Sequence, residues 1–71
     1  MKANLEFNLP EDNEEFYYAN NGSNYYYVCH ELDQHLRSQL KHGSLTEEQD
    51  LVYQEIRDKL RELLEENNVK L

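Results

Sequence analysis

The residues of this sequence that could do chemistry are one cysteine, three histidines and a group of carboxylates near the amino terminus. Cys29 is followed directly by His30, and a thiol next to an imidazole is the pairing used by cysteine nucleophiles. Adjacent residues of a helix point about 100° apart, however, so these two side chains cannot pair. Cys29 also falls on an apolar helical stripe, and we interpret it as a small buried hydrophobe.

The histidines and carboxylates match no recognised metal-ligand pattern. Glu31 and His35 lie four residues apart and could clasp a metal ion across one helical turn, but two ligands do not make a site. The amino-terminal carboxylates lack the alternate spacing and central glycine of a calcium-binding loop. We therefore expect no metal, no cofactor and no catalysis. These carboxylates are Glu11, Asp12, Glu14 and Glu15.

Length and charge limit the classes of function further. The 71 residues provide one small domain with a thin core, and fifteen acidic against seven basic residues give a formal net charge of −8. A nucleic-acid backbone would be repelled, whereas a basic protein partner would be attracted. The single cysteine and the lack of an apolar signal segment or membrane-spanning run predict a cytoplasmic protein that does not bind membranes.

The amino-terminal third predicts an arm and a short helix. Residues 1–9 read as a short strand or an extended arm, because apolar and polar residues alternate from Leu5 to Leu9. Pro10 ends this segment. Proline and acidic residues both suit a first helical turn, so a short helix is expected over residues 10–20, up to an Asn-Asn-Gly sequence.

Two longer helices follow. Ser23 or Asn24 can cap a helix over residues 24–41, and Thr46 with Gln49 fits a capping box that starts a third helix. The apolar positions recur at spacings of three and four. The expected buried stripes are Tyr25, Cys29, Leu32, Leu36 and Leu40 on the second helix, and Val52, Tyr53, Ile56, Leu60, Leu63 and Leu64 on the third.

The third helix is expected to run to about residue 66. Asn67 and Asn68 are suited to cap its carboxyl end, after which Val69 and Leu71 fold back.

The resulting prediction is a mostly α-helical fold in a single small domain over residues 1–71. The arm and the short helix pack across an antiparallel hairpin of the two longer helices. Leu32 and Ile56 are expected at the centre of the two stripes that face each other.

Two surfaces could bind a partner, and the first is an acidic ridge on the third helix. It lies opposite the apolar stripe, is about 28 Å long, and could imitate a row of phosphates. The alternative is an ordinary solvated face, partly neutralised by pairing of Glu55 with Lys59 and of Arg61 with Glu65. The ridge consists of Glu47, Glu48, Glu55, Asp58, Glu62, Glu65 and Glu66.

The second surface is rich in tyrosine. The chain has six tyrosines and no tryptophan, and runs of consecutive tyrosines force some rings away from the core. Tyrosine is favoured at protein interfaces because it combines a large apolar ring with a polar tip. Rings that merely fill the rim of a small core are the alternative. The candidate partner-binding residues are Glu11, Asp12, Glu14, Glu15, Tyr17, Tyr18, Tyr26 and Tyr27.

Three runs of sequence, LPEDNEEFYYANNG, ELDQHLRSQLKHGSLTEEQ and IRDKLRELLEENNVKL, resemble a set of small, acidic, largely uncharacterised bacteriophage accessory proteins. Their pattern is close to LPED-x-EEF, DQ-x-LR and LLEENG-x-x-L. The chain departs from it where Asn68 replaces a glycine and in its tyrosine-rich middle. The matching positions include Leu9, Pro10, Glu11, Asp12, Glu14, Glu15, Phe16, Asp33, Gln34, Leu36 and Arg37.

The resemblance implies a phage protein that binds and modulates host machinery or a defence system, and it implies no catalytic residues. The leading hypothesis is therefore a non-enzymatic inhibitor of a host or defence protein in the cytoplasm of the infected bacterium. One alternative is a DNA mimic that uses the acidic ridge. Another is a structural protein that self-assembles as a homodimer, because the apolar edge of Leu5, Phe7 and Leu9 has no second strand to pair with in this chain.

Overall fold

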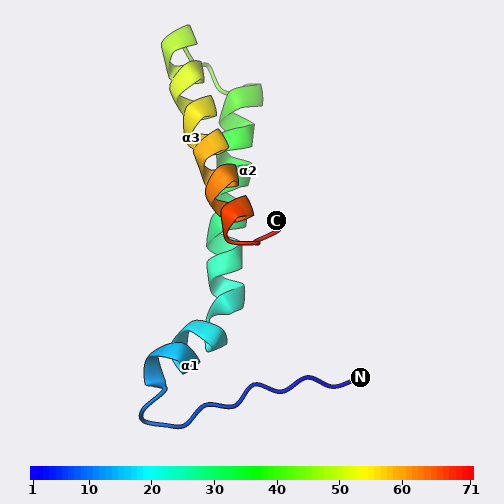
Figure 1. The fold of residues 1–71 in the computed structure, drawn as a ribbon. Helices are drawn as coiled ribbons and strands as arrows, with labels where there is room; N and C mark the ends of the chain where they lie inside the picture. Colours follow the sequence, from blue (N-terminus) through cyan, green and yellow to red (C-terminus); the bar gives the residue numbers. More distant parts are fainter.

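The computed structural model describes residues 1–71 and contains three α-helices and no strand. The helices are α1 (Asn13–Asn20), α2 (Gly22–His42) and α3 (Glu47–Glu66). α2 and α3 lie side by side as an antiparallel hairpin, and α1 with the amino-terminal arm extends beyond one end of α2 (Figure 1). The prediction of a mostly helical, three-helix fold is thus confirmed. The expectation that the arm and the short helix pack across the hairpin is wrong, because α1 contacts α2 but not α3 and lies beyond the hairpin.

The amino-terminal arm is extended, but it forms no strand. Its Phe7 ring packs edge-on against Phe16 with centroids 5.6 Å apart, and the Asn8 N–H donates to Asp12 Oδ2 at 2.8 Å. These contacts fix the arm to α1 across a turn that includes Pro10. Because residues 9–12 form this turn, α1 begins at Asn13 and not at residue 10 as the sequence predicted.

α1 and α2 are separated by Asn21 alone. The Asn21 carbonyl already accepts from the Tyr25 N–H at 3.1 Å, so α2 begins at Gly22, ahead of the predicted residue 24. The prediction that Ser23 or Asn24 caps this helix is wrong. Asn24 instead donates from Nδ2 to Asn21 Oδ1 at 3.1 Å, which braces the junction.

The connection between α2 and α3 depends on a close backbone approach and a capping box. A Cβ atom on Gly43 would lie 2.5 Å from the Gln39 carbonyl oxygen, so the chain leaves α2 along a path that only glycine fits. The predicted capping box is confirmed: Thr46 Oγ1 accepts from the Gln49 N–H at 3.2 Å, and Gln49 Oε1 accepts from the Thr46 N–H at 3.0 Å.

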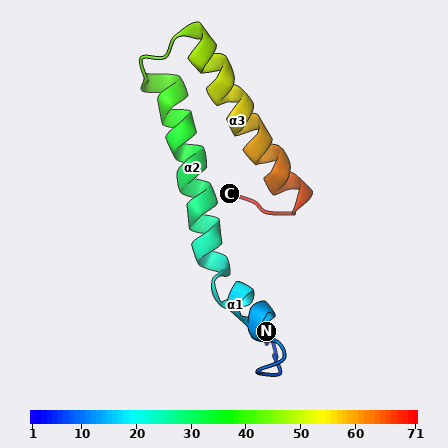
Figure 2. The same ribbon diagram turned by 90° about the vertical axis from the view of Figure 1, so that its left-hand side faces the viewer.

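Asparagines end α3 as the sequence predicted. Asn68 has a φ of 57°, in the left-handed region, and its N–H donates to the Glu65 carbonyl at 3.1 Å. The Val69 N–H donates to the Leu64 carbonyl at 2.8 Å, which completes a Schellman motif. The tail after this motif turns back from α3 toward α2 (Figure 2).

Fewer apolar side chains are buried than the two predicted stripes contain. The only buried apolar side chains are Leu36 and Leu64, which are 5% and 8% exposed. Leu32 and Ile56, predicted to lie at the centre of the contact, are 44% and 46% exposed. The two helices are rotated so that they meet along one edge of each stripe, and the other edge stays open.

The molecule is correspondingly elongated. Its radius of gyration is 17.0 Å, against about 11 Å for a compact domain of this length. None of the three helices has both the length and the apolar character needed to span a bilayer.

We expect Leu36→Ala to lower the free energy of unfolding by roughly 2–4 kcal/mol, because it removes one of the two buried leucines. Leu51→Ala, at a position that is 71% exposed, is the matched control and should change it by less than about 0.5 kcal/mol. Urea unfolding followed by circular dichroism measures both. Equal losses for the two variants would contradict this assignment of the core.

Candidate functional site

The most buried residue of the chain is a charged one. Asp33 in α2 is 1% exposed and bonds two arginines of α3. Arg57 donates from Nε to Asp33 Oδ1 at 3.1 Å, and Arg61 donates from Nη2 to Asp33 Oδ2 at 3.3 Å. Both carboxylate oxygens are thereby satisfied, and the contact ties α2 to α3 between positions far apart in the sequence.

The two arginines decide the ionisation of Asp33. Burial alone would raise the pKa of this carboxyl, but the hydrogen bond and positive charge of Arg57, with the charge of Arg61 beside it, hold the pKa below its ordinary value. Asp33 is therefore an anion at neutral pH.

Sequence reasoning missed this contact. It paired Arg61 with Glu65 and Lys59 with Glu55, whereas Arg61 reaches Asp33, and Lys59 Nζ lies 3.6 Å from Glu62 Oε1. The sequence did contain one sign of a buried aspartate. Asp33 lies on the apolar stripe of α2, four residues after Cys29 and three before Leu36.

Four of the candidate binding residues are tyrosines that gather around the α1–α2 junction. Tyr17 and Tyr18 lie at the end of α1, and Tyr26 and Tyr27 lie in the first turns of α2, across Asn21. All four rings are exposed, and each neighbouring pair packs edge to face with centroids 6.0 Å and 5.9 Å apart. The structure thus brings the predicted tyrosines together at one end of the molecule.

Tyr25, in the first turn of α2, lies near Tyr17 of α1. Partial burial raises the pKa of its phenol, and the adjacent Tyr17 hydroxyl adds to the effect. Tyr26 in turn stacks on His30 with an interplanar angle of 16° and centroids 6.1 Å apart. The end of the molecule therefore presents a set of rings held by their neighbours, which lowers the entropy cost of binding a partner.

Of the four predicted carboxylates, two accept hydrogen bonds within the chain and two do not. Asp12 accepts from the arm, and Glu14 Oε1 accepts from the Tyr18 hydroxyl at 2.9 Å. Glu11 and Glu15 are exposed and make no hydrogen bond or ion pair within the chain. Two charges thus remain free, one in the turn before α1 and one in its first turn, and Glu14 orients one of the rings.

The acidic ridge of α3 is exposed along its whole length. Within it, Asp58 accepts from Gln54 Nε2 at 2.9 Å and Glu62 pairs with Lys59. The other carboxylates of the ridge have no partner in the chain. These are Glu47, Glu48, Glu55, Glu65 and Glu66.

The remaining candidates for chemistry do not converge. The structure brings together no group of three or more histidine, cysteine, aspartate or glutamate side chains that could hold a metal ion. Cys29 is a free thiol on the apolar stripe of α2. Its side chain is half-buried, whereas the sequence predicted a buried one.

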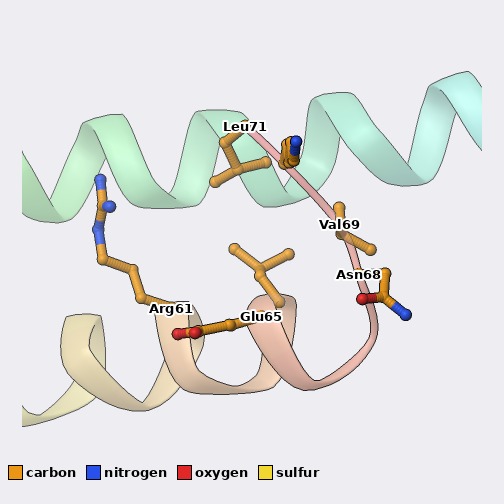
Figure 3. Close-up of a pocket in the computed structure, with 7 residues that line it drawn as sticks. Arg61, Glu65, Asn68, Val69 and Leu71 are labelled. Atoms are coloured by element: carbon orange, nitrogen blue, oxygen red, sulfur yellow. The ribbon is translucent and has the colours of Figure 1, made fainter.

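A half-open cavity of about 370 Å³ lies between α3 and the carboxyl-terminal tail. Arg61, Val69 and Leu71 contribute to its wall, and Arg61 crosses from α3 toward α2 (Figure 3). Because one wall is the short tail, the shape of the cavity depends on the left-handed turn at Asn68.

The chain matches no protein-family model, no curated protein and no solved structure. The resemblance to phage accessory proteins therefore rests on its sequence motifs alone.

We expect Asp33→Asn to lower the free energy of unfolding at neutral pH by roughly 2–3 kcal/mol, because it leaves a largely buried arginine without its anion. The folded pKa of Asp33 is depressed, so its stabilisation is complete above the unfolded pKa of about 4 and is lost as pH falls below it.

Urea unfolding of parent and variant at pH 7 and pH 3 measures this difference, with the exposed Asp58→Asn as control. The stabilities of parent and Asp33→Asn should converge in acid. A constant gap between them, or none at neutral pH, would contradict the assignment.

Proposed function

We propose that this chain is a non-enzymatic, phage-encoded modulator that binds a host or defence protein in the cytoplasm of an infected bacterium. The observation that supports this proposal is the two pairs of exposed tyrosines on either side of the α1–α2 junction, with the free carboxylates of Glu11 and Glu15 before α1 and in its first turn. Protein-binding surfaces commonly have aromatic residues at their centre and a polar rim.

The charge favours one kind of partner. A net charge of −8 accelerates encounter with a basic protein surface and opposes binding to nucleic acid or anionic lipid. The free carboxylates would contact lysine or arginine side chains at the rim, while the tyrosines supply the desolvated centre. Occupation of such a surface is sufficient for inhibition and requires no catalytic group.

A second candidate is mimicry of DNA by the ridge on α3, which is favoured by its five unpaired carboxylates. The two candidates differ in their dependence on salt. Binding through a row of charges weakens steeply as ionic strength rises, whereas binding centred on tyrosine rings weakens little.

The test is capture from a bacterial lysate by the tagged full chain, with quantitative binding of the captured protein. We expect Tyr18→Ser with Tyr27→Ser to weaken binding at least about tenfold, because exposed tyrosines are common hot spots. The control is the ridge variant Glu55→Gln with Asp58→Asn, which should bind as the parent does. If the tyrosine variant still binds the captured protein, but binding is lost in the ridge variant or at high salt, DNA mimicry is favoured instead.

A further inference from the structure

The α2–α3 hairpin carries an apolar surface that no other part of the chain buries. Its side chains come from the open edges of the two stripes, and they are 44–67% exposed. Exposed apolar side chains that gather on one side of a protein commonly mark an interaction surface. We call this surface the hairpin face. It consists of Val28 and Leu32 on α2 and of Val52, Ile56 and Leu63 on α3.

The two rows of the hairpin face lie on the same side of the hairpin. The hydrogen bond between Arg57 and Asp33 shows that each of these positions points toward the other helix. Leu32 and Ile56 each come one residue earlier, so each is turned about 100° from that contact. Because α2 and α3 run in opposite directions and face each other, the two turns lead to the same side (Figure 2). The other members lie four or seven residues from Leu32 or Ile56, and therefore on the same sides of their helices.

The charged residues that border the hairpin face are mostly acidic. Residues three or four apart on a helix are neighbours on its surface, and by this spacing the face has four glutamates and one lysine beside it. The lysine lies 3.6 Å from Glu62, which offsets its charge, whereas three of the glutamates form no ion pair within the chain. The border thus carries negative charge. It consists of Glu31, Glu48, Glu55, Lys59 and Glu66.

This negative border discriminates between the occupants that an apolar face could have. A second copy would bring the four glutamates of one chain against the same four of the other, in a chain of net charge −8. An anionic membrane surface would be repelled in the same way. A cationic partner instead places its positive groups on these carboxylates while its apolar side chains cover the face.

The geometry of the hairpin face favours a helix as the bound segment. Val52 and Leu63 are eleven residues apart on α3, so the face is about 17 Å long, which corresponds to three helical turns. An added strand would need a sheet edge, and the chain has no strand. Proline-rich segments bind grooves lined by aromatic rings, whereas every member of this face is aliphatic. An amphipathic helix presents apolar side chains at spacings of three, four and seven residues, and it therefore matches this face.

We infer that the hairpin face binds a basic amphipathic helix of another protein. The apolar side of the bound helix lies along the two rows of the face. Its lysine or arginine side chains reach carboxylates on both borders, because Glu31 belongs to α2 and the other three glutamates belong to α3. The face includes none of the four tyrosines of the proposed function, so it adds a second binding surface to the chain.

A designed peptide tests this inference on the unmodified chain. The probe is a capped peptide of about 15 residues, with leucines at spacings of three and four and lysines at the other positions. Ile56 is the only isoleucine and Met1 the only methionine, so selective methyl labelling gives one NMR signal from the hairpin face and one from the arm beyond it. We expect saturable binding that shifts the Ile56 signal and leaves the Met1 signal unchanged.

Two matched peptides separate the contribution of charge from that of apolar contact. The first has glutamates in place of the lysines, and the second has the composition of the probe in a scrambled order that removes the apolar side. Each should bind at least about tenfold more weakly than the probe.

Substitutions of single apolar residues locate the contact on the chain. We expect Ile56→Gln to weaken binding of the lysine peptide at least about tenfold, because it removes the central apolar side chain of the α3 row. Leu51→Gln is the matched control, since Leu51 is 71% exposed, lies in the same helix and is three or four residues from no member of the face. This control should bind the peptide as the parent does.

Substitutions of border charges test the electrostatic part. Glu48→Gln with Glu55→Gln should weaken binding of the lysine peptide about threefold or more, because charges at a rim contribute little individually. The control is Glu47→Gln with Glu65→Gln, which removes two other carboxylates of α3 that are three or four residues from no member of the face. It should change binding by less than the border variant does.

Several results would overturn the inference. Absence of saturable binding does so, as does equal binding of the lysine and glutamate peptides. A shift of the Ile56 signal with protein concentration alone, in a chain that the lysine peptide does not bind, assigns the face to a second copy. Loss of peptide binding in Tyr18→Ser with Tyr27→Ser assigns the peptide to the tyrosines and not to the hairpin face. Failure to capture a host protein through the tyrosines, by contrast, bears on the proposed function alone.

Discussion

The buried carboxylate of Asp33 is the contact on which the arrangement of this molecule depends. It is held by two arginines one turn apart on α3, so it fixes both the register and the rotation of α2 against α3. That rotation places Leu36 and Leu64 inside and turns Leu32 and Ile56 outward. A buried ion pair adds little net stability compared with apolar packing, but it penalises every other register in which the charge loses its partners.

The positions of the acidic ridge and of the tyrosines follow from this rotation and from the elongated shape. The acidic ridge runs along the outer side of α3, and the tyrosines lie in α1 and in the first turns of α2. Figure 1 shows that α1 leaves the end of α2 away from α3. The aromatic and the acidic groups are therefore carried largely by different helices.

The local features of the fold could be predicted from sequence, because they depend on neighbouring residues. The capping box at Thr46 and the left-handed turn at Asn68 are each encoded within a few positions. The rotation of the helices could not be predicted, since each apolar stripe is wide enough to be buried along either edge. The choice depends on Asp33 meeting Arg57, 24 residues away, and a helical wheel treats each helix separately. Among the candidate site residues, the exposure and grouping of the tyrosines followed from their consecutive placement, but the use of Asp12 and Glu14 within the chain did not.

A double-mutant cycle between Asp33→Asn and Arg57→Gln, measured by urea unfolding at one fixed protein concentration and neutral pH, tests the central claim most directly. If the ion pair sets the contact between α2 and α3, the two substitutions should be coupled by about 1–3 kcal/mol. The coupling of Asp33 with the more exposed Arg61 should be smaller, at most about 1 kcal/mol. Losses for Asp33 and Arg57 that add to within about 0.3–0.5 kcal/mol would show that the two side chains act independently, and would contradict the account.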